Sequence, residues 1–132
     1  MTEALRTLVP IFAVAVGGCV GAVARFLIGS AFAERETRLF VLTGTVVANG
    51  LGCLLIGVLV AAVPKEATLW RLGLITGLLG SLTTFSTYSY ETVSLLERRQ
   101  YAPAAANAIG SVLLGLVAVA AGLWIGRRLR GE

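Results

Sequence analysis

The chain has 132 residues, of which 57% are hydrophobic and only 14% are charged. Soluble domains average about 25% charged residues, so this composition excludes an ordinary soluble globule, a disordered chain and a disulfide scaffold. The formal net charge is +4, but the basic residues flank apolar segments, which favours membrane-surface anchors over a nucleic-acid-binding face. Histidine and aspartate are absent, which excludes most metal-dependent, histidine-based and aspartate-based catalysis.

Four apolar segments are each long enough to cross a bilayer, whose hydrocarbon core requires about 20 helical residues. We expect an all-α membrane protein with transmembrane helices over residues 7–28, 40–63, 69–96 and 102–125, in one domain over residues 1–132. Strands are not expected, because the apolar runs are continuous and do not alternate. Small residues four apart predict closely packed helices. These pairs are Gly17 and Gly21, Gly73 and Gly77, Ser111 and Gly115, and Gly122 and Gly126.

The distribution of lysine and arginine gives a weak signal for orientation in the membrane. Six of these residues fall on the side that holds both ends of the chain and the second loop: Arg6, Lys65, Arg71, Arg127, Arg128 and Arg130. The other side has four, Arg35, Arg38, Arg98 and Arg99, or five if Arg25 is included. So small a bias allows insertion in both orientations, and two opposed copies would form an antiparallel homodimer. A single orientation with the C-terminal arginines inside is the alternative.

The third segment is interrupted by a polar stretch. Residues 81–89 contain six serines and threonines, and Gly77 and Gly80 precede them. Such a run favours a broken helix, because hydroxyl groups compete for backbone hydrogen bonds. At membrane depth, freed carbonyls bind cations, whereas freed amides and hydroxyls donate to anions. The stretch therefore predicts an ion site; the alternative is a continuous helix whose hydroxyls bond to its own carbonyls.

Other polar residues lie within or near the apolar segments. Arg25 is either a membrane anchor or a positive charge that attracts anions to a pore mouth. Asn49 is either an anion donor or a polar contact between helices, and Asn107 and Ser111 share one helix face. Glu91 follows the hydroxyl run, where it would cap a helix or accept protons. The first, second and fourth segments contain no embedded carboxylate, which weighs against a proton-coupled transporter. The sequence offers no pair of nucleophile and base and no metal-ligand cluster, which weighs against an intramembrane enzyme.

Three motifs in this order resemble the Fluc or CrcB family of small bacterial fluoride channels. They are GGCVGAVARF at residues 17–26, GTVVANGLGCLLIG at 44–57 and GLLGSLTTFSTYSYE at 77–91. The resemblance covers nearly the whole chain, and the third motif is the most specific. It implies a multi-pass protein of the bacterial inner membrane that passively exports fluoride and lowers its toxicity. It also implies an antiparallel, dual-topology homodimer with two pores.

The resemblance further implies roles for individual residues. A structural sodium ion would be held on the two-fold axis by the backbone carbonyls of Gly80 and Thr83. Arg25 matches the family's vestibule arginine, and Glu91 matches the glutamate after the hydroxyl run. The expected fluoride pathway comprises Asn49, Thr84, Phe85, Thr87, Tyr88, Asn107 and Ser111. Tyr88 departs from the family's second pore phenylalanine. In the fourth-segment polar track, Asn107 and Gly115 stand where some members have a tyrosine and a serine, and Ser111 keeps its hydroxyl.

Fluoride is small and strongly hydrated, so a pore must replace its water with hydrogen-bond donors. Asn49, Thr84, Thr87, Ser111 and the Tyr88 hydroxyl offer N–H or O–H groups. The ring edge of Phe85 is the positive part of an aromatic quadrupole and so suits an anion. The alternative functions are those of a small dual-topology multidrug transporter, which would need an embedded glutamate in the first helix, and of a membrane assembly subunit that transports nothing.

Overall fold

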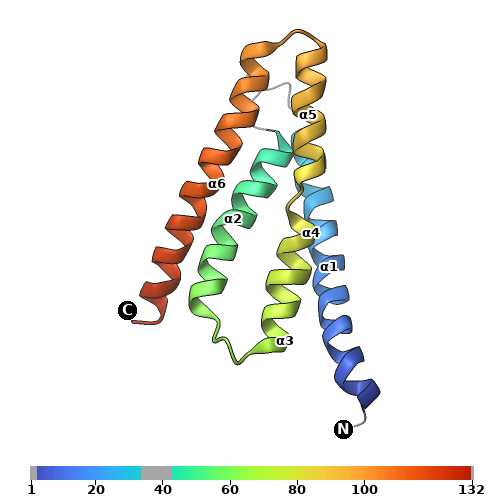
Figure 1. Cartoon of the computed structure of the whole chain (residues 1–132), viewed down its shortest axis with the longest axis vertical. Coiled ribbons are helices and arrows are strands. Elements are labelled where there is room, and N and C mark those ends of the chain that lie inside the picture. The colour runs from blue at the N-terminus through green and yellow to red at the C-terminus, as the bar shows by residue number, and fades with distance from the viewer. Residues whose placement is uncertain (1–2, 34–42, 132) are drawn as a thin grey trace.

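The computed structural model describes residues 3–33 and 43–131 of the chain. Every regular element in these two ranges is helical. The elements are α1 (Glu3–Ala33), α2 (Gly44–Ala62), α3 (Thr68–Arg71), the π-helix η1 (Leu72–Leu79), α4 (Gly80–Leu82), α5 (Phe85–Glu97) and α6 (Tyr101–Leu129). Both termini and the α2–α3 turn lie at one end of the molecule, and the α5–α6 turn lies at the other (Figure 1). The expected all-helical architecture is therefore confirmed for the described residues.

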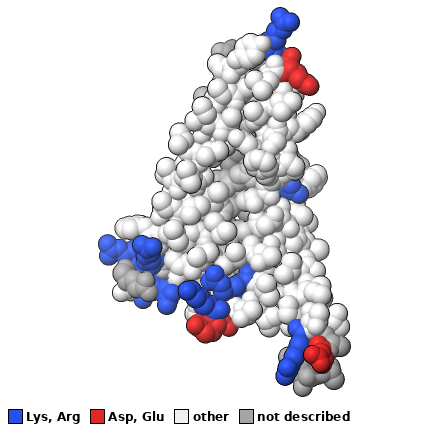
Figure 2. Space-filling model, viewed as in Figure 1, with Lys and Arg blue, Asp and Glu red and all other residues white. Residues whose placement is uncertain are grey.

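Within the described residues, three helices are long and apolar enough to cross a membrane: Leu5–Phe32 within α1, Gly44–Ala62 and Tyr101–Leu129. α1 and α6 extend beyond the predicted spans 7–28 and 102–125, whereas residues 40–42 of the second predicted span lie outside the described residues. Lysine, arginine and glutamate atoms gather at the two ends, and the surface between them is mostly uncharged (Figure 2). This arrangement is that of a protein with an apolar belt facing lipid.

The third predicted span, residues 69–96, is divided into α3, η1, α4 and α5. The predicted interruption is confirmed: the backbone becomes extended at Thr83 (φ −87°, ψ 151°) and Thr84 (φ −146°, ψ 117°). The π-helical turns of η1 were not expected from the sequence. A π-helix is rare, and its hydrogen bonds join residues five apart and not four. Its eight residues therefore change the register of the helix immediately before the break.

Local sequence signals place the ends of α2. Thr43 has an extended backbone, and its hydroxyl accepts a hydrogen bond from Val46 N at 3.2 Å, which caps the helix. At the other end Val63 is extended, because it precedes Pro64 and proline disfavours a helical conformation in the residue before it. Because α2 begins at Gly44, Thr45 and Asn49 lie one turn apart on the same face of its N-terminal half.

The helices pack in two close pairs, α1 with η1 and α2 with α6, and fewer contacts join the pairs to each other. Glycine makes both pairs possible. A methyl group added at Gly77 would lie 2.5 Å from Val14 O, and one added at Gly57 would lie 2.5 Å from Val119 O. Gly17, Gly21, Gly122 and Gly126 make comparable approaches to facing backbone. The predicted role of the small-residue pairs is confirmed for all of these glycines except Gly57, which no predicted pair included. The two helix pairs leave a groove between α2 and η1.

Candidate functional site: two cavities that meet at the helix break

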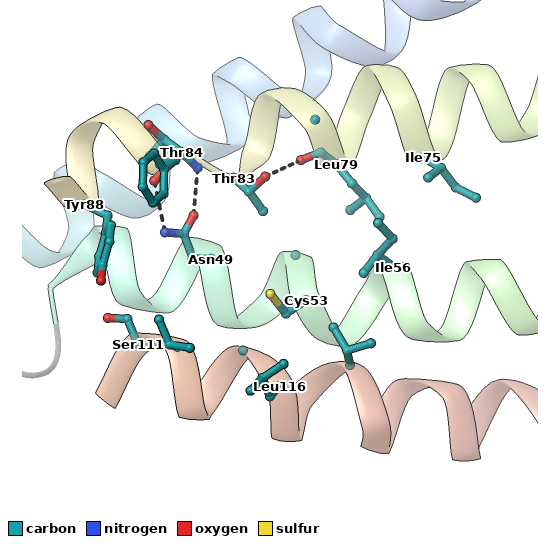
Figure 3. Close-up of a pocket in the computed structure, with 16 residues that line it drawn as sticks. Asn49, Cys53, Ile56, Ile75, Leu79, Thr83, Thr84, Tyr88, Ser111 and Leu116 are labelled. Carbon is teal, nitrogen blue, oxygen red and sulfur yellow. Dashed lines mark hydrogen bonds between the residues drawn. The ribbon is translucent and has the colours of Figure 1, made fainter. Parts of the chain in front are cut away.

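Asn49 on α2 is bound to the broken part of the third segment. Its Nδ2 donates to Thr84 O at 3.1 Å, and its Oδ1 accepts from Thr84 N at 2.8 Å (Figure 3). The side-chain amide therefore pairs with both backbone groups of one residue, as a neighbouring peptide group would in a sheet. One N–H of the Asn49 amide is left over from this pairing.

These hydrogen bonds free two backbone carbonyls. In a continuous α-helix Thr84 N–H would donate to Gly80 O, and Thr87 N–H would donate to Thr83 O. Thr84 N–H donates instead to Asn49, and Thr87 N–H donates instead to Thr84 Oγ1 at 3.2 Å. Gly80 and Thr83, the two expected sodium ligands, are therefore the first and last of the four residues, 80–83, whose carbonyls lack their helical donors at the break.

Several residues expected to form a fluoride pathway line one groove of about 490 Å³ between α2, the broken segment and α6. The pathway residues on its wall are Asn49, Thr84, Phe85, Tyr88 and Ser111. Gly80 and Thr83 line the same groove, and Ile56, Ile75, Leu79, Leu116 and Val119 are among the residues that make the rest of its wall mostly apolar. Figure 3 shows side chains from the three helices converging on this space. The wall thus combines a few polar groups with a large apolar surface.

Arg25 lines a second cavity of about 290 Å³, together with Thr45, Thr84 and Thr87. Its side chain is half-buried, and its guanidinium makes no ion pair or hydrogen bond with another of the described residues. Because this cavity holds a fixed positive charge, its walls suit an anion, and an anion would draw on the charge first, since the hydroxyls of Thr45 and Thr84 already donate to Glu91 and Thr87. Thr84 lines both cavities and is 8% exposed, so the two spaces meet at the break.

Glu91 on α5 is held by two hydroxyls beside α2. Thr45 Oγ1 donates to Glu91 Oε1 at 2.6 Å, and Thr43 Oγ1 donates to Oε2 at 3.4 Å. The carboxylate therefore ties α5 to the start of α2, near the cavity that Arg25 lines. Sequence spacing offered a partial signal for this contact, since Thr45 lies four residues before Asn49 and shares its face. The pairing with Glu91, 46 residues away, had no signal.

Asn107 lies outside both cavities and is 2% exposed. Its Nδ2 donates to Thr92 Oγ1 at 2.9 Å, and its Oδ1 accepts a longer bond of 3.4 Å from Ser111 Oγ. The structure therefore divides the predicted polar track: Ser111 and Gly115 line the groove, and Asn107 is buried between α5 and α6. Thr92 was not among the predicted site residues, because nothing in its sequence context indicates that α6 lies against it.

Comparison with known proteins adds the family. The pattern of the family described as "CrcB-like protein, Camphor Resistance (CrcB)" matches residues 12–123, which is most of the chain. The chain belongs to the CrcB-like family. The resemblance inferred from the three motifs is thereby confirmed, and with its three apolar helices of membrane-crossing length this CrcB-like chain is a multi-pass membrane protein.

Three curated relatives of the CrcB-like chain are each named fluoride-specific ion channel FluC. The relative from Chloroflexus aurantiacus is 44% identical over 124 residues, which are 92% of this chain and 98% of the relative. The relative from Stutzerimonas stutzeri is 47% identical over 119 residues, 88% of this chain and 95% of the relative. The relative from Geobacter sulfurreducens is 42% identical over 122 residues, 90% of this chain and 98% of the relative.

Proposed function

We propose that this protein is a fluoride-selective ion channel, and not an enzyme, that passively exports fluoride across the bacterial inner membrane and lowers its toxicity. The observation that carries the proposal is the 44% identity, over 92% of the chain, to a relative named as such a channel. The walls of the two cavities support it. Dehydrating an isolated ion costs tens of kcal/mol by idealised estimates, so closely spaced neutral donors beside a fixed arginine suit a small anion.

Fluoride efflux from liposomes tests this function. Purified protein is reconstituted in vesicles loaded with potassium fluoride, a potassium ionophore is added, and released fluoride is followed with an electrode. Rapid efflux of fluoride and slow efflux of chloride are expected. Vesicles that release no more fluoride than protein-free vesicles would contradict the proposal. The same assay separates the assembly-subunit alternative, which predicts no efflux of either anion.

The multidrug-transporter alternative meets a specific difficulty in α1. Such a transporter would need an acid embedded in its first helix to couple protons to export. The acid of α1 is Glu3, in the first turn of a helix that runs to Ala33, so the apolar body of α1 holds no carboxylate. Efflux of an organic cation driven by a proton gradient is the result that would revive this alternative.

The proposal includes an antiparallel, dual-topology homodimer with two pores. Two features of the break support a second copy at the groove: Phe85 is 79% exposed, and Gly80 is exposed with space for a methyl group and no atom within 4 Å of it. A single cysteine near the C-terminus, in a variant lacking Cys19 and Cys53, should be labelled from both sides of one membrane. Labelling from one side alone would contradict this arrangement.

A structural sodium ion is the remaining part of the proposal. Neutral carbonyl oxygens suit a monovalent cation, and those of Gly80 and Thr83 have lost their helical donors to Asn49 and Thr84. Among the described residues no group of three or more cysteines and glutamates forms a site for a divalent metal. Replacing sodium by a large organic cation should loosen the dimer or stop fluoride efflux, and full activity after such exchange would contradict this part.

A further inference from the structure

The phenol of Tyr88 reaches from α5 to α6. Its hydroxyl donates to Ala108 O at 2.9 Å, and its ring centroid lies 5.6 Å from that of Phe85 at an interplanar angle of 40°. Figure 3 shows the hydroxyl end of Tyr88 directed toward the helix that carries Ser111. A phenol has one O–H, so the bond to Ala108 occupies the hydrogen that an anion would need.

A second hydrogen bond joins the same two helices one turn further along α5. Asn107 Nδ2 donates to Thr92 Oγ1 at 2.9 Å, and Thr92 Oγ1 donates to Tyr88 O at 2.9 Å. Asn107 is 2% exposed, so water does not readily take its place as the donor of this second bond. The backbone of Tyr88 and its phenol are therefore both bound into one contact between α5 and α6.

We propose that Tyr88 is a positioning residue for anion selectivity, in which the hydroxyl is a tether to Ala108 and the ring edge is the part that faces the pathway. The proposal rests on the proposed fluoride-channel function. A tethered ring keeps one orientation beside Phe85, which fixes the width of the groove and the direction of the positive ring edges. A phenyl ring without the tether would rotate and move aside, so the same space would admit a larger anion.

Tyr88→Phe separates the tether from a direct anion ligand, because it keeps the ring and removes only the hydroxyl. Fluoride and chloride efflux are measured in the same liposome preparation, and their ratio is independent of the number of folded channels. We expect the fluoride rate to fall by less than about tenfold, the scale of one neutral hydrogen bond. The fluoride-to-chloride ratio should fall, because chloride efflux rises. The matched control is Ser89→Ala, whose hydroxyl donates within α5 to Phe85 O at 2.9 Å and should leave the ratio unchanged.

Two results would overturn the proposal. A fluoride rate that falls by more than about a hundredfold, with chloride efflux unchanged, would identify the hydroxyl as a direct ligand, since one neutral hydrogen bond does not account for that loss. An unchanged ratio in Tyr88→Phe would show that the hydroxyl does not position the ring for selectivity.

A double-mutant cycle tests the tether without transport. Thermal unfolding is compared for Tyr88→Phe, Thr92→Val and the double variant, because Thr92 carries the other bond between α5 and α6. The tether predicts that the two effects are coupled and do not add, whereas additive effects would overturn it. If the wild-type protein releases no fluoride, the proposed function fails, and the cycle still decides whether the hydroxyl joins the helices.

Discussion

The side-chain amide of Asn49 takes the place of Gly80 O as the acceptor for Thr84 N–H and thereby stabilises the break in the third membrane segment. The 2.8 Å bond from Thr84 N to Asn49 Oδ1 removes the donor that Gly80 O would have in a continuous helix. The 3.1 Å bond from Asn49 Nδ2 to Thr84 O satisfies the carbonyl on the other side of the same residue. One side chain of α2 therefore stabilises an extended residue at membrane depth, where unpaired backbone groups are costly.

Asn49→Asp should impair both folding and transport. Aspartate still accepts from Thr84 N–H, but it has no donor for Thr84 O and places a carboxylate oxygen against that carbonyl. Leaving a buried carbonyl unpaired costs about 1–3 kcal/mol, so a lower unfolding temperature in detergent is expected, together with strongly reduced fluoride efflux because the new charge repels anions. Asn49→Ala, which removes both bonds without adding charge, separates the two effects. Wild-type stability of Asn49→Asp would show that the amide pairing does not support the break.

The break could be predicted from sequence, but its hydrogen-bond partner could not. Six serines and threonines in residues 81–89 indicated where backbone groups would be diverted. That Asn49 would meet Thr84 depends on how α2 packs, across 35 residues of chain, and no local pattern carries this information. The π-helix of Leu72–Leu79 was missed for a related reason: apart from Thr76 the run LGLITGLL is apolar, so its pattern does not distinguish one helical register from another.

The close pairing of α2 and α6 depends on glycine, and Gly57→Ala should disrupt it. The added methyl group would lie 2.5 Å from Val119 O and 2.8 Å from Leu123 N, both of them backbone atoms that a side-chain rotation cannot move. We expect a loss of about 1–3 kcal/mol in unfolding free energy, as for other overpacked positions, measured by denaturation in detergent.

Gly110→Ala is the matched control for this change. It lies on α6, where an added methyl group meets no atom of the chain within 4 Å. Alanine favours a helix over glycine by about 0.5–1 kcal/mol, so Gly110→Ala should leave stability equal or slightly higher. Equal losses at both positions would mean that helix packing in the protomer is not the cause. The sequence indicated that Gly122 and Gly126 would allow close packing, but only the structure shows that α2 is the helix that approaches them.

Thr45→Val should weaken the attachment of α5 to α2. Valine keeps the shape of threonine but removes the 2.6 Å bond to Glu91, leaving that carboxylate with the 3.4 Å bond from Thr43. Hydrogen bonds to charged groups contribute roughly 1.5–3 kcal/mol, so a loss on this scale is expected in thermal unfolding. In Glu91→Gln, the further effect of Thr45→Val should be smaller, because the charge is gone. Additive effects would show that Thr45 and Glu91 do not act as a pair. The control is Thr7→Val, which should change the unfolding temperature little, because the Thr7 hydroxyl bonds only within exposed α1.

Phe85→Ile should abolish or strongly reduce fluoride efflux while leaving the protein folded. The ring is 79% exposed in the protomer, so replacing it removes little packing within the chain. If the Phe85 side chain is packed in the proposed dimer, replacing it with one of another shape should cost about 1–3 kcal/mol of stability. A loss of that size does not prevent a well-packed bundle from folding. Isoleucine has similar bulk but no aromatic quadrupole, so the positive ring edge beside the groove is lost.

Phe12→Ile provides the comparison for Phe85→Ile. Phe12 is also an exposed phenylalanine, at 71%, but it lies on α1 and lines neither cavity. Both variants are purified, their elution as folded particles is checked by size exclusion, and fluoride efflux from liposomes is compared with that of the wild-type protein. Phe12→Ile should retain wild-type efflux. If Phe85→Ile also does so, the aromatic edge is not used, and the anion must be carried by the remaining N–H of Asn49 and by the hydroxyls of Thr84 and Ser111, which would have to leave their acceptors on Thr87 and Asn107. If both variants lose efflux equally, the loss reflects the membrane-facing surface and not the groove.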